Sequence, residues 1–363
     1  MRPKSVEQLA GMVADAAASG RRLEIAGGGT QADIGAPREA ERLDMTGFCG
    51  VIDYDPAELV LTAGAGTPLA GIEALVAAKG QMLAFEPHGA EGSTIGGVVA
   101  AGVSGSRRVS RGAVRDHLLG FKAVSGRGEA FVGGAKVVKN VTGYDLPKLA
   151  AGSWGRLFAL TEVTLKVLPR PPEQLTLAID GLSPSDAVAL MSRAMGSKAD
   201  VAAAACMGDV TAIRLEGFGP SVAARRALLE DMAPVRAVSA GEARALWKGF
   251  EAPLAEAPAL WRLGLPASRA ADVVGKGLGP WSMDWAGARV WLACDDAQAV
   301  RAAAEGADGH AMLVRAPEAL RRTVPMLHPQ PAPVMALEAR LRRAFDPMGV
   351  FETGRFLDQP HAD

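Results

Sequence analysis

The amino-acid sequence predicts an α+β fold built from two domains, and three observations lead to this expectation. The first half of the chain carries short apolar stretches separated by glycine turns, with few stretches that have the periodicity of a long helix. Of the 43 glycines, 27 lie between Gly11 and Gly155, whereas residues 171–363 hold the other 16 and are rich in alanine and arginine. Glycine inside a helix or strand costs roughly 0.5–1 kcal/mol relative to alanine, so the dense half needs tight turns or a closely approaching ligand.

The third observation is a proline cluster that separates the two halves. In "KVLPRPPEQLTL", three prolines end an apolar strand and make a short, stiff connection: Pro169, Pro171 and Pro172. A chain of 363 residues is long enough for two hydrophobic cores. We therefore expect a first domain over residues 1–170, a second domain over 171–330, and a C-terminal helix and tail over 331–363.

The elements of the first half are short and end at glycines. The stretch "TPLAGIEALVAAKG" (67–80) is amphipathic and closed by glycine, which predicts a helix. Four of the other apolar stretches are six to nine residues long, the usual length of strands, and the last is fourteen residues long. They predict strands within 22–27, 58–66, 118–126, 129–134 and 156–169.

The second half alternates strands with helices. This pattern predicts a small antiparallel sheet covered on one face by helices. We expect strands at 175–179, 201–207, 211–217, 261–266, 288–293 and 310–315, and helices at 187–195, 221–232 and 297–306. In the tail, "MALEARLRRAF" predicts a helix that stops before Pro347.

Composition excludes several classes of protein. A formal net charge of −1 gives no field to attract nucleic acid or an acidic membrane. Glu7 and Asp15 interrupt any signal-peptide core, and no apolar stretch approaches the roughly 18 residues that span a bilayer, so we expect a cytoplasmic protein. The cysteines are scattered singly, which excludes a disulfide framework and a cysteine-rich zinc or iron-sulfur motif: Cys49, Cys206 and Cys294.

Glycine-rich loops are the candidate ligand-binding motifs. Neither G-x-G-x-x-G opening a helix nor G-x-x-x-x-G-K-[ST] occurs, which disfavours a Rossmann dehydrogenase and a P-loop protein. In "RLEIAGGGTQADIG", adjacent backbone N–H groups of 27–29, followed by Thr30 and Gln31, can bind an anion such as a pyrophosphate. We expect a side chain at Gly28 to occupy the space of that ligand. The alternative is a flexible surface turn.

Two further loops accompany the first. "EGSTIGGVVAAGVSG" (91–105) supplies hydroxyls and bare backbone, and "VVKNVTGYDLPKLAAGSWGRLFALTEVTLKVLP" (137–169) is the third motif. The order GGGT, P…STIGG…G, KN-x-x-GYDL-x-x-L-x-x-GS-x-G and TEVTLK-x-LP resembles the FAD-binding half of the vanillyl-alcohol oxidase flavoproteins. The stretches "LWRLGLP", "MDWAGARVWL" and 54–87 resemble, over nearly the whole chain, the FAD-binding subunits of bacterial glycolate oxidases (glycolate dehydrogenases).

The resemblance implies a PCMH-type FAD-binding fold of two α+β subdomains, followed by an α+β cap domain and a tail that returns to the FAD domain. In that family the first two loops bind the FAD pyrophosphate. Some relatives attach FAD covalently through a histidine after the glycine run, where this chain has Thr30, so we expect non-covalent FAD. The cofactor residues implied are Gly27, Gly28, Gly29, Thr30, Gln31, Pro87, Ser93, Thr94, Gly96, Gly97, Gly102, Ser104, Tyr144 and Arg355.

Two parts of the resemblance leave alternatives open. Asp145 and Tyr144 have a structural alternative, in which Asp145 caps the helix of "LPKLAAG" and Tyr144 fills the core. At the C-terminus the family usually has D-P-x-G-x-F-N-P-G-[RK], whereas this chain has "DPMGVFETGR" (346–355). Glu352 and Thr353 therefore replace an Asn-Pro pair, and an ionised acid cannot donate to the flavin ring as an amide would.

Oxidation of a 2-hydroxy acid needs a cation for the carboxylate and a base for the hydroxyl. Arg262 in "LWRLGLP" is the candidate cation and His310 in "ADGHAML" the candidate base. The alternative for Arg262, as for Arg214 and Arg289, is a solvated strand face. For His310 it is a turn histidine satisfied by backbone. His88 lies in the predicted flavin loop.

One expected motif is missing. Relatives that oxidise D-2-hydroxy acids often carry a paired-histidine metal motif, H-P-G-x-G-x-x-H, where this chain has only "DGHAM", so no metal is expected. The resemblance implies a complex with a second FAD-containing subunit and an iron-sulfur subunit, which could hold the chain at the inner membrane. Two roles remain: a subunit that oxidises glycolate or a D-lactate-like 2-hydroxy acid, and a non-catalytic FAD-loaded relay or scaffold. A third, remoter role is a nicotinamide-dependent reductase like the peptidoglycan-precursor reductases.

Overall fold

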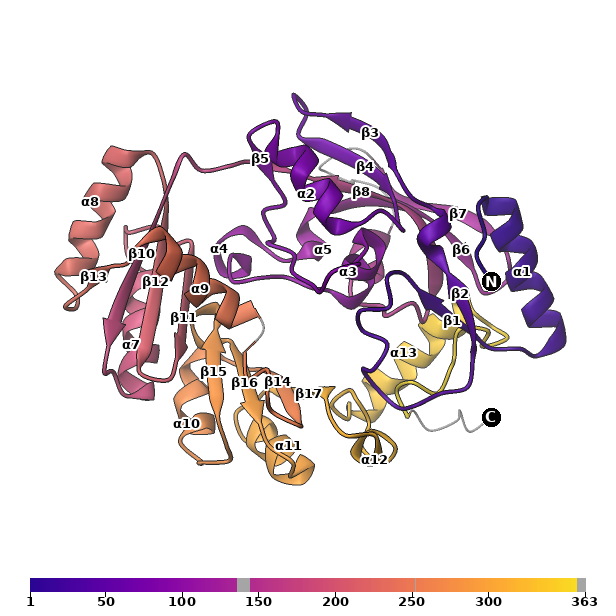
Figure 1. Ribbon diagram of the computed structural model, residues 1–363. Helices are drawn as coiled ribbons and strands as arrows, with labels where there is room; N and C mark the ends of the chain where they lie inside the picture. The colour runs from indigo at the N-terminus through magenta and orange to yellow at the C-terminus, as the bar shows by residue number, and fades with distance from the viewer. Residues whose placement is uncertain (136–143, 252, 358–363) are drawn as a thin grey trace.

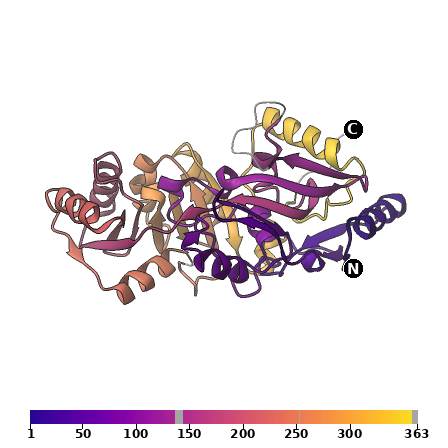
Figure 2. The same ribbon diagram turned by 90° about the horizontal axis from the view of Figure 1, so that it is seen from above.

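The structure, a computed structural model, describes residues 1–135, 144–251 and 253–357. Two domains lie side by side, the first drawn in indigo to magenta and the second in salmon to orange (Figure 1; Figure 2). Both are α+β, and both main sheets are antiparallel, so the predicted fold class is confirmed. No helix in these residues is long and apolar enough to cross a membrane.

The first domain contains two subdomains. In the smaller one, helix α1 (Val6–Ser19) packs on the parallel pair β1 (Leu23–Ala26) and β2 (Glu41–Asp44), with η1 (Met45–Gly47) following. Ser5 caps α1 by accepting from the backbone of Gln8, and the helix ends at Gly20 in the left-handed region (φ 67°). Strand β1 matches the strand predicted within 22–27 and delivers the chain into the triple-glycine turn.

The larger subdomain is built on a five-stranded sheet in the order β3-β4-β8-β6-β7. Its core includes a stacked Phe121–Phe158 pair whose ring centroids lie 5.0 Å apart. The strands are β3 (Val51–Asp55), β4 (Val60–Gly64), β6 (Leu118–Ser125), β7 (Ala130–Gly134) and β8 (Phe158–Lys166), with β5 (Gln81–Met82) paired to β9 (Leu168–Pro169). The helices are α2 (Leu69–Ala77), α3 (Ile95–Ala101), α4 (Arg108–Arg111), α5 (Val114–His117) and α6 (Leu146–Ala150).

The second domain contains an eight-stranded antiparallel sheet in the order β13-β10-β12-β11-β15-β16-β14-β17. The strands are β10 (Glu173–Asp180), β11 (Ala203–Met207), β12 (Val210–Gly217), β13 (Arg236–Ala237), β14 (Leu260–Gly264), β15 (Trp281–Asp284), β16 (Arg289–Ala293) and β17 (His310–Arg315). The expectation of a small sheet was wrong, since β13 and β15 are too short to show a clear pattern in the sequence.

Helices cover both faces of this sheet, whereas the sequence predicted one covered face. Four helices contribute to the main core on one face: α7 (Pro184–Met195), α8 (Gly219–Glu230), α10 (Ala270–Val274) and α11 (Ala297–Glu305). On the other face, α9 (Ala240–Glu251) packs Trp247 and Phe250 against Ala203, Ala205 and Ala212. The remaining short elements are η2 (Ala267–Arg269), η3 (Trp285–Gly287) and α12 (Glu318–Arg321).

The C-terminal segment packs on the first domain. Helix α13 (Ala332–Phe345) ends before Pro347, as predicted. It lies along the five-stranded sheet (Figure 2). The Phe345 ring contacts the rings of Phe131 and Phe158. Beyond it, Val350 and Phe351 enter the core of the smaller subdomain. Residues more than 300 positions from β1 thereby support the turn that follows it.

Candidate functional site

A cavity of about 1060 Å³ lies between the first two glycine-rich loops and is called here the glycine-loop cavity. Nine of the residues predicted to bind a cofactor line it together with Arg355: Gly27, Gly28, Gly29, Thr30, Gln31, Ser93, Thr94, Gly96 and Gly97. The topology thus brings together two motifs that are about 60 residues apart in the sequence.

The bare backbone of the triple glycine is explained by the second loop. A Cβ atom on Gly28 would lie 1.7 Å from the carbonyl oxygen of Gly92, and one on Gly27 would lie 2.2 Å from Thr94 Oγ1. Next to this contact, the hydroxyls of Thr30 and Ser93 are 3.2 Å apart. We expected a side chain at Gly28 to occupy the space of the ligand. That expectation was wrong, because the Cβ would first meet the backbone of the second loop.

The first loop, which lines the glycine-loop cavity, has hydrogen-bonding groups without a partner among the described residues. Within the described part of the chain, the backbone N–H groups of Gly28, Gly29, Thr30 and Gln31 have no acceptor, and Gln31 Oε1 is buried without a partner. Gly29 adopts φ 76°, a left-handed conformation that suits glycine. Such adjacent donors form a concavity that fits a pyrophosphate.

The remaining predicted cofactor residues lie elsewhere. Gly102 and Ser104 line a second cavity, described below. Pro87 is buried but lines neither cavity. Tyr144 is 91% exposed and lines neither cavity, so the interpretation that it fills the core was wrong. Asp145 caps α6 by accepting from the backbone of Lys148, as the structural alternative predicted.

Arg355 reaches the first loop from the C-terminus. Its guanidinium donates to the carbonyl oxygens of Ile34 (2.9 Å) and Gln31 (2.5 Å) and lies over the Trp154 ring. Burial lowers the pKa of Arg355 to about 10. Trp154 itself lines the glycine-loop cavity; it stands in the third motif, in "GSWG", and sequence reasoning assigned it no role.

The departure from the family's Asn-Pro pattern lies outside both cavities. Glu352 forms ion pairs with Arg156 (3.3 Å) and Arg342 (3.1 Å) and lines neither cavity. Arg156 also pairs with Glu338 of α13. The acid at position 352 therefore belongs to a charge cluster that ties α13 to the first domain.

The second cavity, of about 860 Å³, is called here the arginine cavity. It adjoins the glycine-loop cavity, since both are lined by Gln31, His88, Ala101, Val103 and Trp154. The second domain contributes the charged and aromatic side chains of the other wall: Glu251, Arg262, Trp285, Arg289, Trp291 and Arg315. A molecule in the arginine cavity would lie between the two domains.

The three arginines differ in their partners. Arg289 is 2% exposed and pairs with Asp284 while donating to the Ser104 carbonyl (3.0 Å). Arg315 donates to the carbonyls of Leu254 and Ala257. Among the described residues, Arg262 has only the Met312 sulfur, 3.1 Å from Nη2, as an acceptor.

Within the residues that the structure describes, Arg262 is therefore a cation without an anionic partner. Burial, with repulsion from Arg289 and Arg108, lowers its pKa to about 10, so it stays charged at neutral pH. The interpretation of these arginines as a solvated strand face was wrong, because Arg214 and Arg289 are buried and Arg262 faces a cavity. A buried charge without a partner is costly, and an anionic ligand would offset that cost.

The two histidines near the site occupy different places. His88 lines both cavities, and burial is the main cause that lowers its pKa to about 4, so its ring is neutral at neutral pH. His310, the predicted base, lines neither of them. It lies in a third, outer cavity with Arg108, Arg262 and Trp285. Among the described residues, no three or more His, Cys, Asp or Glu side chains gather to hold a metal ion.

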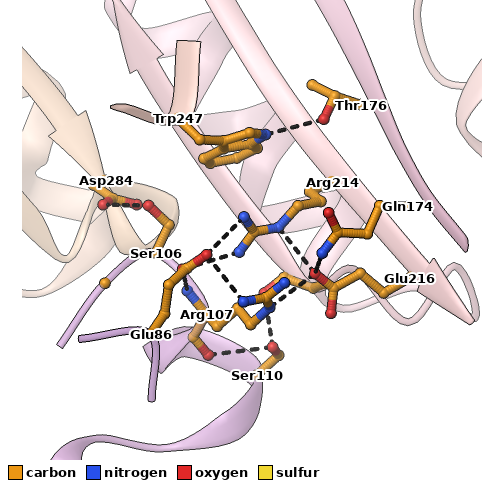
Figure 3. A network of polar contacts seen from close by, with 12 residues as sticks. Glu86, Ser106, Arg107, Ser110, Gln174, Thr176, Arg214, Glu216, Trp247 and Asp284 are labelled. Carbon is orange, nitrogen blue, oxygen red and sulfur yellow. Dashed lines mark hydrogen bonds and ion pairs between the residues drawn. The ribbon is translucent and has the colours of Figure 1, made fainter. Parts of the chain in front are cut away.

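A buried charge network joins the two domains (Figure 3). Arg214 of β12 reaches both carboxylate oxygens of Glu86 at 2.9 and 3.0 Å. Arg107 donates to Glu216 at 2.8 Å, and its side chain also pairs with Glu86. We call Glu86, Arg107, Arg214 and Glu216 the interdomain clamp. The clamp holds the segment that leads into His88.

The family model of an FAD binding domain matches residues 1–134. The chain is 37% identical to the glycolate oxidase subunit GlcE of Escherichia coli K12 over 340 residues, covering 92% of each chain. It is 30% identical to a D-lactate dehydrogenase of Archaeoglobus fulgidus over 52% of this chain and 42% of that protein.

A likeness to solved structures concerns the fold. A structure of alkyldihydroxyacetonephosphate synthase superposes with a TM-score of 0.69 and 14% identity, covering 97% of this chain and 76% of the other. At this identity the likeness shows a shared architecture alone. The superposition covers 97% of this chain, so the shared architecture includes the second domain.

Proposed function

The chain belongs to the family of the glycolate oxidase subunit GlcE and is an FAD-linked oxidoreductase subunit, and we propose that it oxidises glycolate or a D-lactate-like 2-hydroxy acid to the 2-oxo acid. One observation carries this proposal. The glycine-loop cavity adjoins a second cavity in which the described residues leave Arg262 without a carboxylate partner. A cofactor and a small anion would therefore lie next to each other.

FAD would be held by the two glycine-rich loops. The free N–H groups of residues 28–31 suit its pyrophosphate, with Thr30 and Ser93 at the contact between the loops. Binding is non-covalent in this proposal, because Thr30 stands where some relatives carry the histidine that attaches FAD. When bound, FAD accepts the hydride that leaves the substrate carbon.

Arg262 would bind the substrate carboxylate. Its planar guanidinium can donate two parallel hydrogen bonds to one carboxylate. Arg289 and Arg315 are already engaged by Asp284 and by backbone carbonyls, so they raise the positive potential of the cavity rather than replace Arg262. Trp285 and Trp291 also line this cavity.

The proposed oxidation is tested with the visible absorption spectrum of the purified chain under anaerobic conditions. We expect a flavin spectrum that is bleached on addition of glycolate or D-lactate, because hydride transfer reduces the cofactor. A flavin spectrum that neither acid changes would contradict the catalytic role. Denaturation should release all the flavin into the soluble fraction, and flavin that stays with the polypeptide would contradict non-covalent binding.

Replacing Arg262 should lower substrate affinity and raise stability at the same time. Arg262→Met keeps an unbranched, though shorter, side chain but removes a charge-assisted hydrogen bond of about 1.5–3 kcal/mol, so KM should rise roughly 10- to 150-fold. The Tm without substrate should rise, because the variant no longer buries a cation lacking a carboxylate partner within the described residues. Steady-state kinetics and thermal unfolding measure the two effects.

Arg301→Met is the matched control for this variant. Arg301 also has a pKa lowered by burial, but it donates to the carbonyls of Pro325 and Leu327 and lines none of the three cavities. Its KM should stay within about twofold of the unmodified protein, the range usual for a site outside the binding machinery. An Arg262→Met variant with unchanged KM would remove Arg262 from substrate binding.

A second candidate is a non-catalytic, FAD-loaded relay or scaffold subunit of a glycolate oxidase complex. The position of His310 favours it, because the candidate base lies in the outer cavity, away from the glycine loops. Both candidates predict a second FAD-containing subunit and an iron-sulfur subunit, since the three scattered cysteines cannot hold a cluster. Such partners would keep this cytoplasmic chain at the inner membrane. Purification from its host without any partner would contradict the complex.

A further inference from the structure

We propose that Glu251 is the base that accepts the hydroxyl proton of the 2-hydroxy acid. This inference rests on the proposed oxidation and assigns its missing proton acceptor. Glu251 is the last residue of α9 and lines the arginine cavity with Arg262 and Arg289. No other carboxylate lines that cavity among the described residues.

The end of α9 is firmly placed. Phe250 is fully buried, and Trp247 is 8% exposed and donates its indole N–H to Thr176 Oγ1 at 2.9 Å. Glu251 follows Trp247 by four residues, so both lie on the same side of the helix. Because Trp247 packs on the sheet, Glu251 also lies on the sheet side of α9, and it lines the arginine cavity there. Figure 3 shows Trp247 over Arg214 of the interdomain clamp.

The carboxylate of Glu251 has no hydrogen-bond or ion-pair partner within the residues that the structure describes. Arg289 is paired with Asp284, and Arg315 donates to backbone carbonyls, although both arginine side chains line one cavity with Glu251. A half-buried acid left unpaired beside cations is available to a ligand in the cavity. A proton acceptor must have such free lone pairs.

The charged groups around Glu251 explain its proton affinity. Burial is the main cause that raises its pKa to about 7, and the carboxylates of Glu86 and Glu73 raise it further, whereas Arg214 and Arg289 lower it. The other charged or titratable groups that line the cavity are Arg262, Arg315 and His88. A base with a pKa near the working pH is the most effective proton acceptor.

The histidines are poorer candidates for this role. His88 lines the cavity, but its pKa of about 4 makes it a weak base. His310 faces the outer cavity, and burial, with repulsion from Arg262, lowers its pKa as well. Glu251 therefore combines position, a free carboxylate and suitable basicity.

The reaction balances as follows. With its carboxylate on Arg262, the substrate loses its hydroxyl proton to the Glu251 carboxylate and its Cα hydrogen, with two electrons, to FAD. The O–H and Cα–H bonds break, and the electron pair of the O–H bond forms the second bond of the carbonyl. The products are the 2-oxo acid, protonated Glu251 and reduced flavin, and Glu251 then releases its proton to solvent.

The test compares Glu251→Gln with Glu256→Gln in the FAD-loaded chain. Glu256 is an exposed acid just beyond α9 that lines none of the cavities, so it is a matched control. Flavin reduction by glycolate is followed in single turnovers at several pH values. The unmodified rate should rise with pH and level off above about 7. Glu251→Gln should reduce flavin about 10²- to 10⁴-fold more slowly with no such rise, and Glu256→Gln should behave like the unmodified chain.

Oxalate supplies a readout that does not depend on turnover, because it has two carboxylates and no Cα–H bond to oxidise. Its Kd should rise about tenfold as the pH increases through about 7, since ionised Glu251 repels a bound anion. In Glu251→Gln the Kd should stay at its low-pH value. Glu251→Asp should keep the pH dependence, which separates loss of the ionisable group from damage to the fold.

The outcomes distinguish the two proposals. Reduction of Glu251→Gln at the unmodified rate, or an oxalate Kd with the same pH dependence in this variant, would overturn the role of Glu251 and leave the proposed function intact. The unmodified chain could also hold FAD that neither glycolate nor D-lactate reduces at any pH. That result would contradict the proposed oxidation, and no base would then be needed.

Discussion

Gly28→Val should abolish stable FAD binding. A Cβ at this position would lie 1.7 Å from the Gly92 carbonyl oxygen, so the first two glycine loops must separate. That separation misaligns the free N–H groups of residues 28–31. Loss of even one charge-assisted hydrogen bond of about 1.5–3 kcal/mol weakens binding roughly 10- to 150-fold. The purified variant should contain little flavin, and FAD titration of the apoprotein should show the weaker Kd.

The control for this variant is Gly71→Val. Gly71 lies in α2, and a Cβ built on it meets no atom within 4 Å, so the same substitution has open space there. Gly71→Val should retain its flavin. Circular dichroism of both variants checks that the domains remain folded. A soluble Gly28→Val with full FAD occupancy would show that the contact between the loops does not shape the cofactor site.

Glu86→Gln should destabilise the protein by about 3 kcal/mol, the lower end of the effect of breaking a buried ion pair. Glu86 accepts from both terminal nitrogens of Arg214 and from the backbone of Arg107. In the variant, these two buried arginines keep Glu216 as their only carboxylate within the clamp. The free energy of unfolding in urea measures the loss.

Glu242→Gln is the surface control. Glu242 pairs with Arg236, but both side chains are more than 40% exposed, so its loss should cost about 0–1 kcal/mol. An equal effect of the two variants would contradict a special role for the interdomain clamp. Because the clamp joins the domains, limited proteolysis should also cut Glu86→Gln faster than either the control or the unmodified chain.

The effect of Glu86→Gln should depend on pH in a defined direction. Burial alone would raise the pKa of Glu86, but Arg214 and Arg107 outweigh it and hold the pKa below its ordinary value of 4.5. A depressed pKa in the folded state contributes stability that is present above the unfolded pKa and lost as the pH falls through the folded pKa. The difference between the unmodified chain and the variant should therefore be complete near neutral pH and shrink below about 4.5.

Local patterns predicted much of the fold and most of the loop residues that line the glycine-loop cavity. The strand ending in the triple glycine, the second loop and the helix before Pro347 all appear as expected. Short-range chemistry accounts for this success, since glycine turns, helix caps and apolar periodicity act within a few residues. Strands β13 and β15 of the second domain were not predicted, because two or four residues show little periodicity.

The substrate side of the site could not be predicted in the same way. Arg214, Arg262 and Arg289 alternate with apolar neighbours, which is typical of a solvated strand face, yet each points to the boundary between the domains. Glu251 gave no signal in the sequence, since a single acid at a helix end resembles any exposed residue. Its position became significant because Trp247 packs on the sheet.

By itself, the sequence determined the α+β class, the glycine loops and the membership in a family of FAD-linked subunits, because these depend on local conformation and on motifs. Only the tertiary structure decided why Gly28 must be bare, which arginine has no carboxylate partner among the described residues, and which base lies beside it. The contact at Gly28 joins it to Gly92, 64 positions away, and the arginine cavity is lined by residues of both domains. The charge state and role of a side chain depend on neighbours that the chain brings together only when it folds.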